Sequence, residues 1–180
     1  MRWSTGALAG ACSLAGVLLW RMRPQPSEPE DPAWEPRALA RFARWEPRPV
    51  TSPVGMSVAA VWASPMTVAG LLLAATALAP VHLTSEGFLV TGARGPLGAV
   101  LRRRGFRATT LGHVVITLDE PSPALLAHEQ LHSRQVERLG PAFGPVYVLL
   151  LVLYGYRRHP MERAARRAGR RVAGDATGVG

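Results

Sequence analysis

A run of 27 residues without a charged side chain, residues 54–80, limits what this chain can fold into more than any other feature. As a helix the run would extend about 40 Å, which exceeds the ~30 Å hydrocarbon thickness of a bilayer. Pro65 and Gly70 lie inside it, and both residue types are tolerated in membrane-spanning helices. Burying such a helix in a soluble protein needs a larger core than 180 residues can build. The run therefore predicts a transmembrane helix at 54–80.

A second apolar segment lies at the start of the chain, in residues 1–20. Residues 5–20 carry no charge, arginines lie on both sides, and Trp3 and Trp20 stand at the two ends, where interfacial aromatic residues are favoured. The segment is short for a span, so a signal-like segment is the alternative to a membrane anchor. We favour an uncleaved anchor, because no small-residue cleavage site follows the apolar core. The chain is thus expected to have one or two N-terminal transmembrane helices.

Residues 21–53 have the composition of a linker. They hold eight of the sixteen prolines, interleaved with glutamates and arginines, and cannot bury enough apolar surface to fold alone. Within this Pro-rich linker, residues 36–45 show the pattern of one short amphipathic helix, with Leu39, Phe42 and Trp45 on one face. Such a helix would either lie on the membrane surface or form a simple turn of the linker.

The distribution of charge indicates where the chain resides. All 21 basic residues are arginine, and Ala, Gly and Pro are abundant, which is typical of a GC-rich bacterial genome. Residues 81–180 carry 14 arginines against seven acids, so they suit contact with anionic membrane lipids and favour a cytoplasmic side. No helix-turn-helix, zinc-finger or aromatic RNA-binding pattern accompanies the charge, so nucleic acid is not an expected partner. These features predict an integral protein of the bacterial cytoplasmic membrane.

The sequence His128-Glu129-Gln130-Leu131-His132 has the form H-E-x-x-H. On a helix, His128 and His132 lie one turn apart on the same face, so two imidazole nitrogens can bind one metal ion. Glu129 is rotated by about 100° from His128 and can act as general base toward a water at that ion. The pattern predicts a Zn²⁺ site that hydrolyses its substrate.

The setting of this motif is well marked. Ser122 is a suitable N-cap, Pro123 suits the first helical position, and Gly140-Pro141 ends the helix, so the motif helix is expected at 123–139. Short strands are expected at 81–84, 88–91 and 111–118, and residues 101–107, which carry four arginines, are expected to form an exposed connection.

A catalytic zinc site normally has three protein ligands. Downstream of the motif, His159 and Glu162 are the candidates for the third. We favour Glu162, because a helix that begins after Pro160 would present it in its first turns, completing a set of two histidines and a glutamate. This requires that the chain reverse between Gly140 and Pro145, so that residues 142–156 pack back along the motif helix and do not cross the membrane. A 12-residue helix that returns along the motif helix would bring Glu162 to the level of the histidines.

Here the chain resembles the gluzincin-like zinc metallopeptidases, and more closely a family of small, uncharacterised bacterial membrane proteins. The resemblance covers roughly residues 66–168. It rests on four motifs: Gly112-His113-Val114, the H-E-x-x-H stretch with Gln135, Leu139-Gly140-Pro141, and His159-Pro160-Met161-Glu162 with Ala165. The family pattern has Asn and Phe where this chain has His159 and Met161. The resemblance implies that His128, His132 and Glu162 are zinc ligands and that Glu129 is the catalytic base. No acid stands three or four residues after Glu162, so a partner that orients a ligand histidine must come from elsewhere.

Together these patterns predict an α+β protein. The transmembrane helices are followed by a minimal zincin-like domain at 81–172, made of a short antiparallel sheet, the H-E-x-x-H helix and two further helices, with a flexible tail at 173–180. The expected function is that of a membrane-anchored metallopeptidase that hydrolyses a peptide or protein substrate. The alternatives are an inactive membrane protein with a structural zinc site and a membrane-surface interaction protein.

Overall fold

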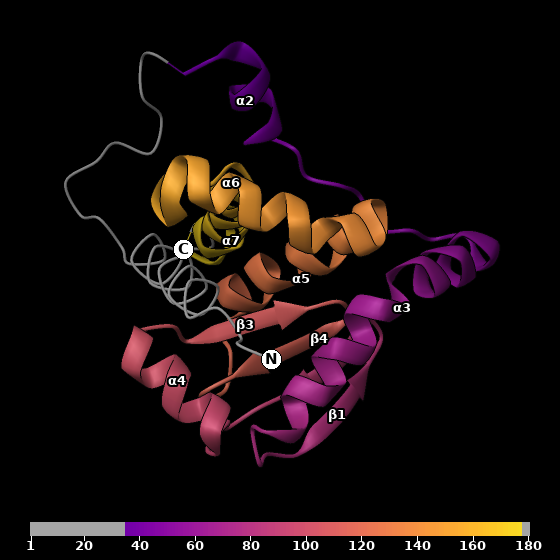
Figure 1. Ribbon diagram of the computed structural model, residues 1–180, viewed down its shortest axis with the longest axis vertical. Helices are drawn as coiled ribbons and strands as arrows, with labels where there is room; N and C mark the ends of the chain where they lie inside the picture. The colour runs from indigo at the N-terminus through magenta and orange to yellow at the C-terminus, as the bar shows by residue number, and fades with distance from the viewer. Residues whose placement is uncertain (1–34, 178–180) are drawn as a thin grey trace, which may run out of the picture.

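The computed structural model describes residues 35–177, and within this range the protein is an α+β domain (Figure 1). The short helix α2 (Arg37–Phe42) is followed by the long helix α3 (Pro53–Ala75) and by a small sheet, and the chain ends in three further helices. The expected anchor at 1–20, residues 21–34 of the expected linker and residues 178–180 of the expected tail lie outside the described residues.

The sheet has four strands in the order β1-β2-β4-β3. These are β1 (Val81–Thr84), β2 (Gly87–Val90), β3 (Ala108–Leu111) and β4 (Val114–Thr117). The β1–β2 and β3–β4 pairs are antiparallel, but β2 and β4 are parallel. The expectation of an antiparallel sheet is therefore wrong, because the chain crosses over between β2 and β3 instead of continuing as a meander.

The crossover is a helix that the sequence does not predict. Helix α4 (Pro96–Arg104) occupies most of the segment expected as an exposed connection, and Leu97 and Leu101 on its inner face are buried against the core around Val90 and Ile116. Consecutive arginines at the end of α4 obscure this apolar face in the sequence. Arginines are favourable in the last turn, because the C-terminal end of a helix carries the negative end of the helix dipole.

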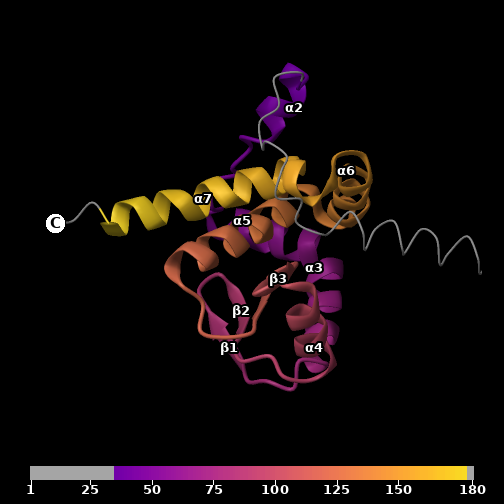
Figure 2. The same cartoon turned by 90° about the vertical axis from the view of Figure 1, so that its left-hand side faces the viewer.

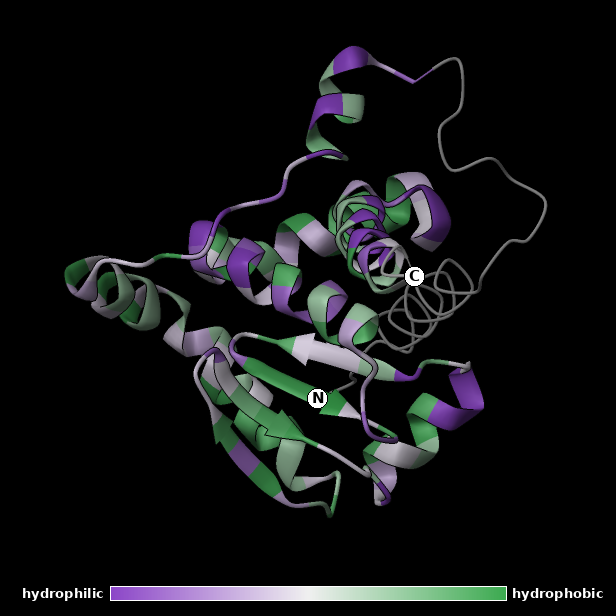
Figure 3. Cartoon of the chain, turned by 180° about the vertical axis from the view of Figure 1, so that it is seen from behind, coloured by the Kyte–Doolittle hydropathy of each residue, from purple (hydrophilic) through white to green (hydrophobic). Residues whose placement is uncertain are grey.

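The strand expected at 111–118 is part of a hairpin. Gly112 and His113 form a tight turn between β3 and β4, and Gly112 takes a φ of 64°, in the left-handed region that glycine enters at little cost. A Cβ at Gly112 would also lie 2.5 Å from the Thr67 Cα on α3. β4 is buried along its whole length. Figure 3 shows the central strands in the green of apolar residues, whereas β3 is nearly white because it contains two threonines.

Helix α3 packs along the sheet through its small residues. Ser52 caps its start by accepting a hydrogen bond from the Gly55 amide, and Ala63, Gly70 and Ala74 are buried. A Cβ at Gly70 would lie 2.3 Å from the Leu111 carbonyl oxygen, so only glycine allows this close approach. The helix ends five residues before the uncharged run does, and its side away from the sheet remains apolar and exposed.

Two helical runs, Pro53–Ala75 and Pro123–Arg158, are long and apolar enough to cross a membrane by length and composition. The second run is divided at Gly140, whose φ of 54° ends helix α5 (Pro123–Leu139). A short 3₁₀ turn, η1 (Gly140–Ala142), then leads into helix α6 (Phe143–Arg158). The chain therefore changes direction in the middle of this run, as the position of Glu162 requires.

Helix α7 (Pro160–Thr177) completes the domain by packing along α5, and Figure 2 shows the two helices side by side. Leu131 of α5 is buried against Ala164 and Ala165 of α7. Because α7 continues to Thr177, residues 173–177 of the expected tail are helical. The expectation that residues 142–156 return along α5 is therefore wrong: α7 packs along α5, while α6 crosses over both helices (Figure 1).

Residues 35–52, part of the expected linker, contact this domain. The α2 helix forms within the range expected for a short helix, and Phe42 with the following Trp45 packs against the cluster that contains Ala63 and Val136. Glu35 forms a buried, two-pronged ion pair with Arg163 of α7, in which Arg163 Nη2 lies 3.0 Å from Glu35 Oε2. The segment therefore ties α7 to the rest of the fold.

Replacing Glu35 by Gln is expected to lower the free energy of unfolding by about 3–5 kcal/mol, because the buried Arg163 guanidinium would lose the carboxylate of its two-pronged ion pair. The matched control is Glu46→Gln, since Glu46 pairs with the exposed Arg171 and such pairs contribute about 0–1 kcal/mol. Denaturant unfolding of the full chain in detergent measures both changes. Equal losses in the two variants would contradict the role given to the buried pair.

Candidate metal centre

Helix α5 presents the two motif histidines toward α7, where both face Glu162. Its bounds are those that the sequence predicts, and the Ser122 hydroxyl accepts a hydrogen bond from the Leu125 amide at 3.2 Å, which confirms the N-cap. The His128 and His132 rings lie one turn apart, with their centroids separated by 5.0 Å. The helix therefore directs both imidazoles to one place, as their spacing predicts.

Glu162 reaches the same place from the first turn of α7. Its Oε2 lies 3.6 Å from His128 Nε2, and its Oε1 lies 3.2 Å from His132 Nε2. Candidate ligand atoms of the three residues all lie within 4.8 Å of one another, so this group could hold a metal ion. His159, the alternative ligand in the sequence, does not belong to the group.

The arrangement fits the geometry of a metal site. Two ligand atoms about 2 Å from a common tetrahedral ion lie ~3.3 Å apart, which is close to both measured separations. Glu162 is only 3% exposed, and its Oε2 accepts no hydrogen bond from any residue in the described part of the chain. A buried carboxylate oxygen without a hydrogen-bond donor is costly unless a cation satisfies it.

The charge of Glu162 suits the same role. Burial alone would raise the pKa of this carboxyl, but the imidazoles of His132 and His128 outweigh burial and hold the pKa well below its usual range. Arg166, one turn further along α7, places its Nη1 3.9 Å from Glu162 Oε2 and adds positive charge. Glu162 is therefore ionised at neutral pH, as a carboxylate ligand must be.

Gln135 orients the ligand histidine. Its side chain is fully buried, and its Oε1 accepts a hydrogen bond of 2.9 Å from His132 Nδ1. A proton held at Nδ1 leaves Nε2, the nitrogen that faces Glu162, as the one that would give up its proton to bind a metal. The partner that the sequence requires from elsewhere is therefore on the motif helix itself, three residues after His132.

We expect Gln135→Met to lower metal affinity by about 10–100-fold, because removing the acceptor for a ligand histidine frees its tautomer and its ring orientation. The matched control is Gln130→Met, since Gln130 lies on the same helix and lines a pocket on the other side of it. Competition titration with a chromogenic chelator measures both affinities. An equal change of metal affinity in the two variants would show that Gln135 does not orient His132.

Tyr147 and His159 support Glu162 from α6 and from the start of α7. The Tyr147 hydroxyl donates a hydrogen bond of 2.7 Å to Glu162 Oε1. His159 packs on the Tyr147 ring at 4.1 Å, and its Nε2 donates to the Tyr147 carbonyl oxygen at 3.0 Å. Burial lowers the pKa of His159 to about 4, so its ring is neutral at pH 7. His159 is therefore a packing residue that holds Tyr147 in place.

Glu129 projects from α5 toward the sheet. It is buried, and its Oε2 accepts a hydrogen bond of 2.5 Å from the Thr110 hydroxyl on β3. Thr110 is a site residue that the sequence does not predict, because nothing distinguishes it from Thr109 beside it until the register of β3 against α5 is known. The pairing fixes one carboxylate oxygen of Glu129.

His113, the other histidine of the matched motifs, lies away from the metal group. Its Nδ1 is 3.0 Å from the Thr67 hydroxyl on α3, and its Nε2 is 3.2 Å from Glu137 Oε1 on α5. Glu137 lies on the side of α5 opposite His128, as a spacing of nine residues requires. His113 therefore connects α3 to α5 and is not part of the site.

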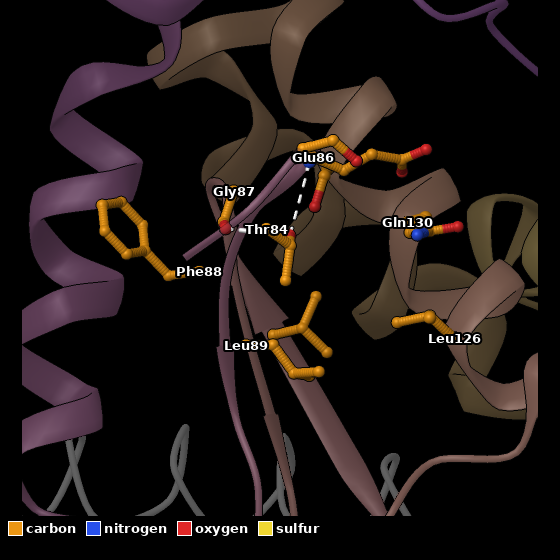
Figure 4. A pocket seen from close by; sticks show the side chains of 10 residues that line it. Thr84, Glu86, Gly87, Phe88, Leu89, Leu126 and Gln130 are labelled. Atoms are coloured by element: carbon orange, nitrogen blue, oxygen red, sulfur yellow. Dashed lines mark hydrogen bonds between the residues drawn. The ribbon is translucent and has the colours of Figure 1, made fainter. Parts of the chain in front are cut away.

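A pocket of about 190 Å³ lies between the β1–β2 turn and α5. Figure 4 shows Leu126 and Gln130 of α5 facing Leu89 and Thr84 across it, whereas Phe88 points to the other side of its strand. None of the three candidate ligands lines this pocket. It is separate from the metal group because its helix residues lie on the opposite side of α5.

Comparisons of the chain with protein-family models, with curated proteins and with solved structures find no match. The site itself consists of two imidazoles and one ionised carboxylate, and a second carboxylate, Glu129, lies on the same helix as the histidines.

Proposed function

We propose that this protein is a membrane-anchored, zinc-dependent metallopeptidase. The observation that carries the proposal is the convergence of His128, His132 and Glu162 on one place, from two helices that are separate in the sequence. Two imidazole nitrogens and one carboxylate oxygen are a ligand set typical of catalytic zinc, which keeps a further position for water or substrate. When bound there, Zn²⁺ would polarise a peptide carbonyl and lower the pKa of water.

The proton transfers of the proposed reaction are assigned to Glu129. Glu129 Oε2 is held by Thr110, so Oε1 is the atom to which we assign the proton taken from the attacking water. The same oxygen then gives this proton to the nitrogen of the leaving amine. Because Glu129 follows His128 in the chain, this base lies close to the metal ligands without being a ligand itself.

The edge of the sheet suits an extended substrate. β3 is the outer strand in the order β1-β2-β4-β3, and it carries Thr110, the partner of Glu129. The outer side of such a strand offers backbone N–H and C=O groups to an added strand. A peptide that pairs with β3 would place its scissile bond beside Glu129.

Membrane attachment rests on helix α3. Its 23 residues extend about 35 Å, enough for the ~30 Å hydrocarbon core, and its outer side is apolar and exposed. The arginine-rich helices α4 and α7 then suit the anionic head groups of a bacterial membrane.

Removing the metal tests the proposal. The full chain, purified in detergent and loaded with Zn²⁺, is expected to cleave members of a quenched-fluorescence peptide library, to lose this activity on treatment with a chelator and to regain it with Zn²⁺. Cleavage that the chelator leaves unchanged, or none by fully loaded protein, would contradict the proposed reaction.

A further inference from the structure

Exposed apolar side chains are concentrated on two helices. Of the fifteen large apolar residues that are exposed in the described part of the chain, eight lie on α3 and three on α6. Those on α3 are Val54, Met56, Val58, Val61, Trp62, Val68, Leu71 and Leu72, and those on α6 are Val148, Leu149 and Leu153. Such a concentration marks an interaction surface, because isolated exposed apolar residues scatter over a soluble protein.

Helix α6 is apolar on its outer side as well as its inner side. Val148, Leu149 and Leu153 are 44%, 58% and 56% exposed and lie on one side of the helix. No charged residue occurs between Phe143 and Tyr156. A helix that is apolar all round is either buried in protein or surrounded by lipid. The described residues leave its outer side uncovered.

The exposed sides of α3 and α6 are continuous. Ala63 and Met66 of α3 belong to the same apolar cluster as Phe143 and Val146 of α6. A Cβ at Gly140, just before α6, would lie 2.3 Å from the Trp62 ring, so the start of α6 rests directly on α3. Figures 1 and 2 place both helices on the same side of α5 and the sheet.

We propose that α3 and α6 form one bilayer-facing surface, and that the metal site beneath α6 acts on membrane-anchored polypeptides close to the lipid. The second half rests on the proposed peptidase function. A bilayer fits better than a second copy of the chain, because the exposed side extends along a helix about as long as the hydrocarbon core is thick.

The site lies one helix away from this surface. Tyr147 is on the inner side of α6 and donates its hydroxyl hydrogen to Glu162, while its neighbour Val148 faces outward. A soluble peptide would have to reach a site held close to the lipid, whereas an anchored polypeptide is already at that level. The site thus selects substrates whose cleavable bond lies close to the membrane surface, which we call selection by depth.

Spin labels test the surface. In a Cys12→Ser background, single labels replace Leu149 and Leu153 on α6, Val61 on α3 as the lipid reference, and the exposed Asp175 on α7 as the water reference. The full chain is placed in vesicles of phosphatidylethanolamine and phosphatidylglycerol. Collision with oxygen, which enters lipid, is then compared with collision with a water-soluble nickel chelate.

Labels at 149 and 153 are expected to match the label at 61, with access to oxygen and little access to nickel. Nickel access equal to that at 175 would show that α6 faces water. Low access to both reagents would show that protein covers it, which indicates a second copy. Either outcome would overturn the bilayer-facing surface, and neither depends on whether the protein binds zinc or cleaves peptides.

The substrate is tested in the same vesicles with two acyl-anchored peptides. They carry one cleavable segment either next to the anchor or after a flexible spacer of about 20 residues, which lets it extend away from the surface. Both peptides have the same surface concentration. Faster cleavage of the short-spacer peptide is expected, and Glu129→Gln is expected to cleave both peptides at least about 10²-fold more slowly. Equal rates would overturn selection by depth while leaving the peptidase function in place.

Discussion

Replacing Glu129 by Gln is expected to lower kcat/KM for peptide cleavage by about 10²–10⁴-fold, the usual contribution of a positioned general base. Glutamine has nearly the same shape as glutamate, and its carbonyl oxygen can still accept the hydrogen bond from Thr110. It cannot take a proton from water. The variant should therefore keep the fold and lose the reaction.

The same variant should keep its metal. Glu129 is not a member of the group formed by His128, His132 and Glu162, so zinc per chain is expected to equal that of the wild type. Glu120→Gln is the matched control, because Glu120 is an exposed glutamate shortly before the motif helix. Elemental analysis and the cleavage assay are performed on the same preparations. Wild-type activity in Glu129→Gln would refute its assignment as the base.

Replacing Glu162 by Ala is expected to lower zinc affinity by more than about 100-fold, since a lost ligand should cost more than a lost supporting contact. Two imidazoles would remain to hold the ion. The loss should also abolish cleavage, because a weakly held ion leaves the site when the protein is diluted. Tyr147, whose hydroxyl now donates to Glu162, would lose its acceptor in this variant.

The neighbouring His159→Asn variant decides between the two ligands that the sequence offers. The His159 ring is buried against Tyr147 and is not a member of the metal group, so this variant should bind zinc as the wild type does. Circular dichroism checks that both variants are folded. Zinc retained by Glu162→Ala and lost by His159→Asn would reverse the assignment.

The features that the sequence predicts correctly depend on residues that are close together in the chain. The bounds of α5 were predictable because Ser122 and Gly140 mark its two ends, and caps depend on neighbouring residues only. The approach of Glu162 to the histidines was predicted, but by the wrong route, because the sequence does not show that α7 and not α6 runs along α5.

The features that the sequence does not predict depend on contacts across the fold. From the sequence alone, Gln135 could orient His132 or simply meet solvent; only the folded chain shows that it is buried. The parallel pairing of β2 with β4 follows from the crossover through α4, and the arginines of that helix hide the buried Leu101. Glu35 lies in a Pro-rich segment, and only the folded chain shows its buried partner Arg163.

The central claim is that one Zn²⁺ is held by two histidines and a glutamate. X-ray absorption at the zinc K-edge of the purified full chain tests it most directly. We predict one zinc per chain, with nitrogen and oxygen ligands at about 2.0–2.1 Å and the scattering of two imidazoles. A protein that binds no zinc, or a shell that contains sulfur at about 2.3 Å from Cys12, the only cysteine, would contradict the account.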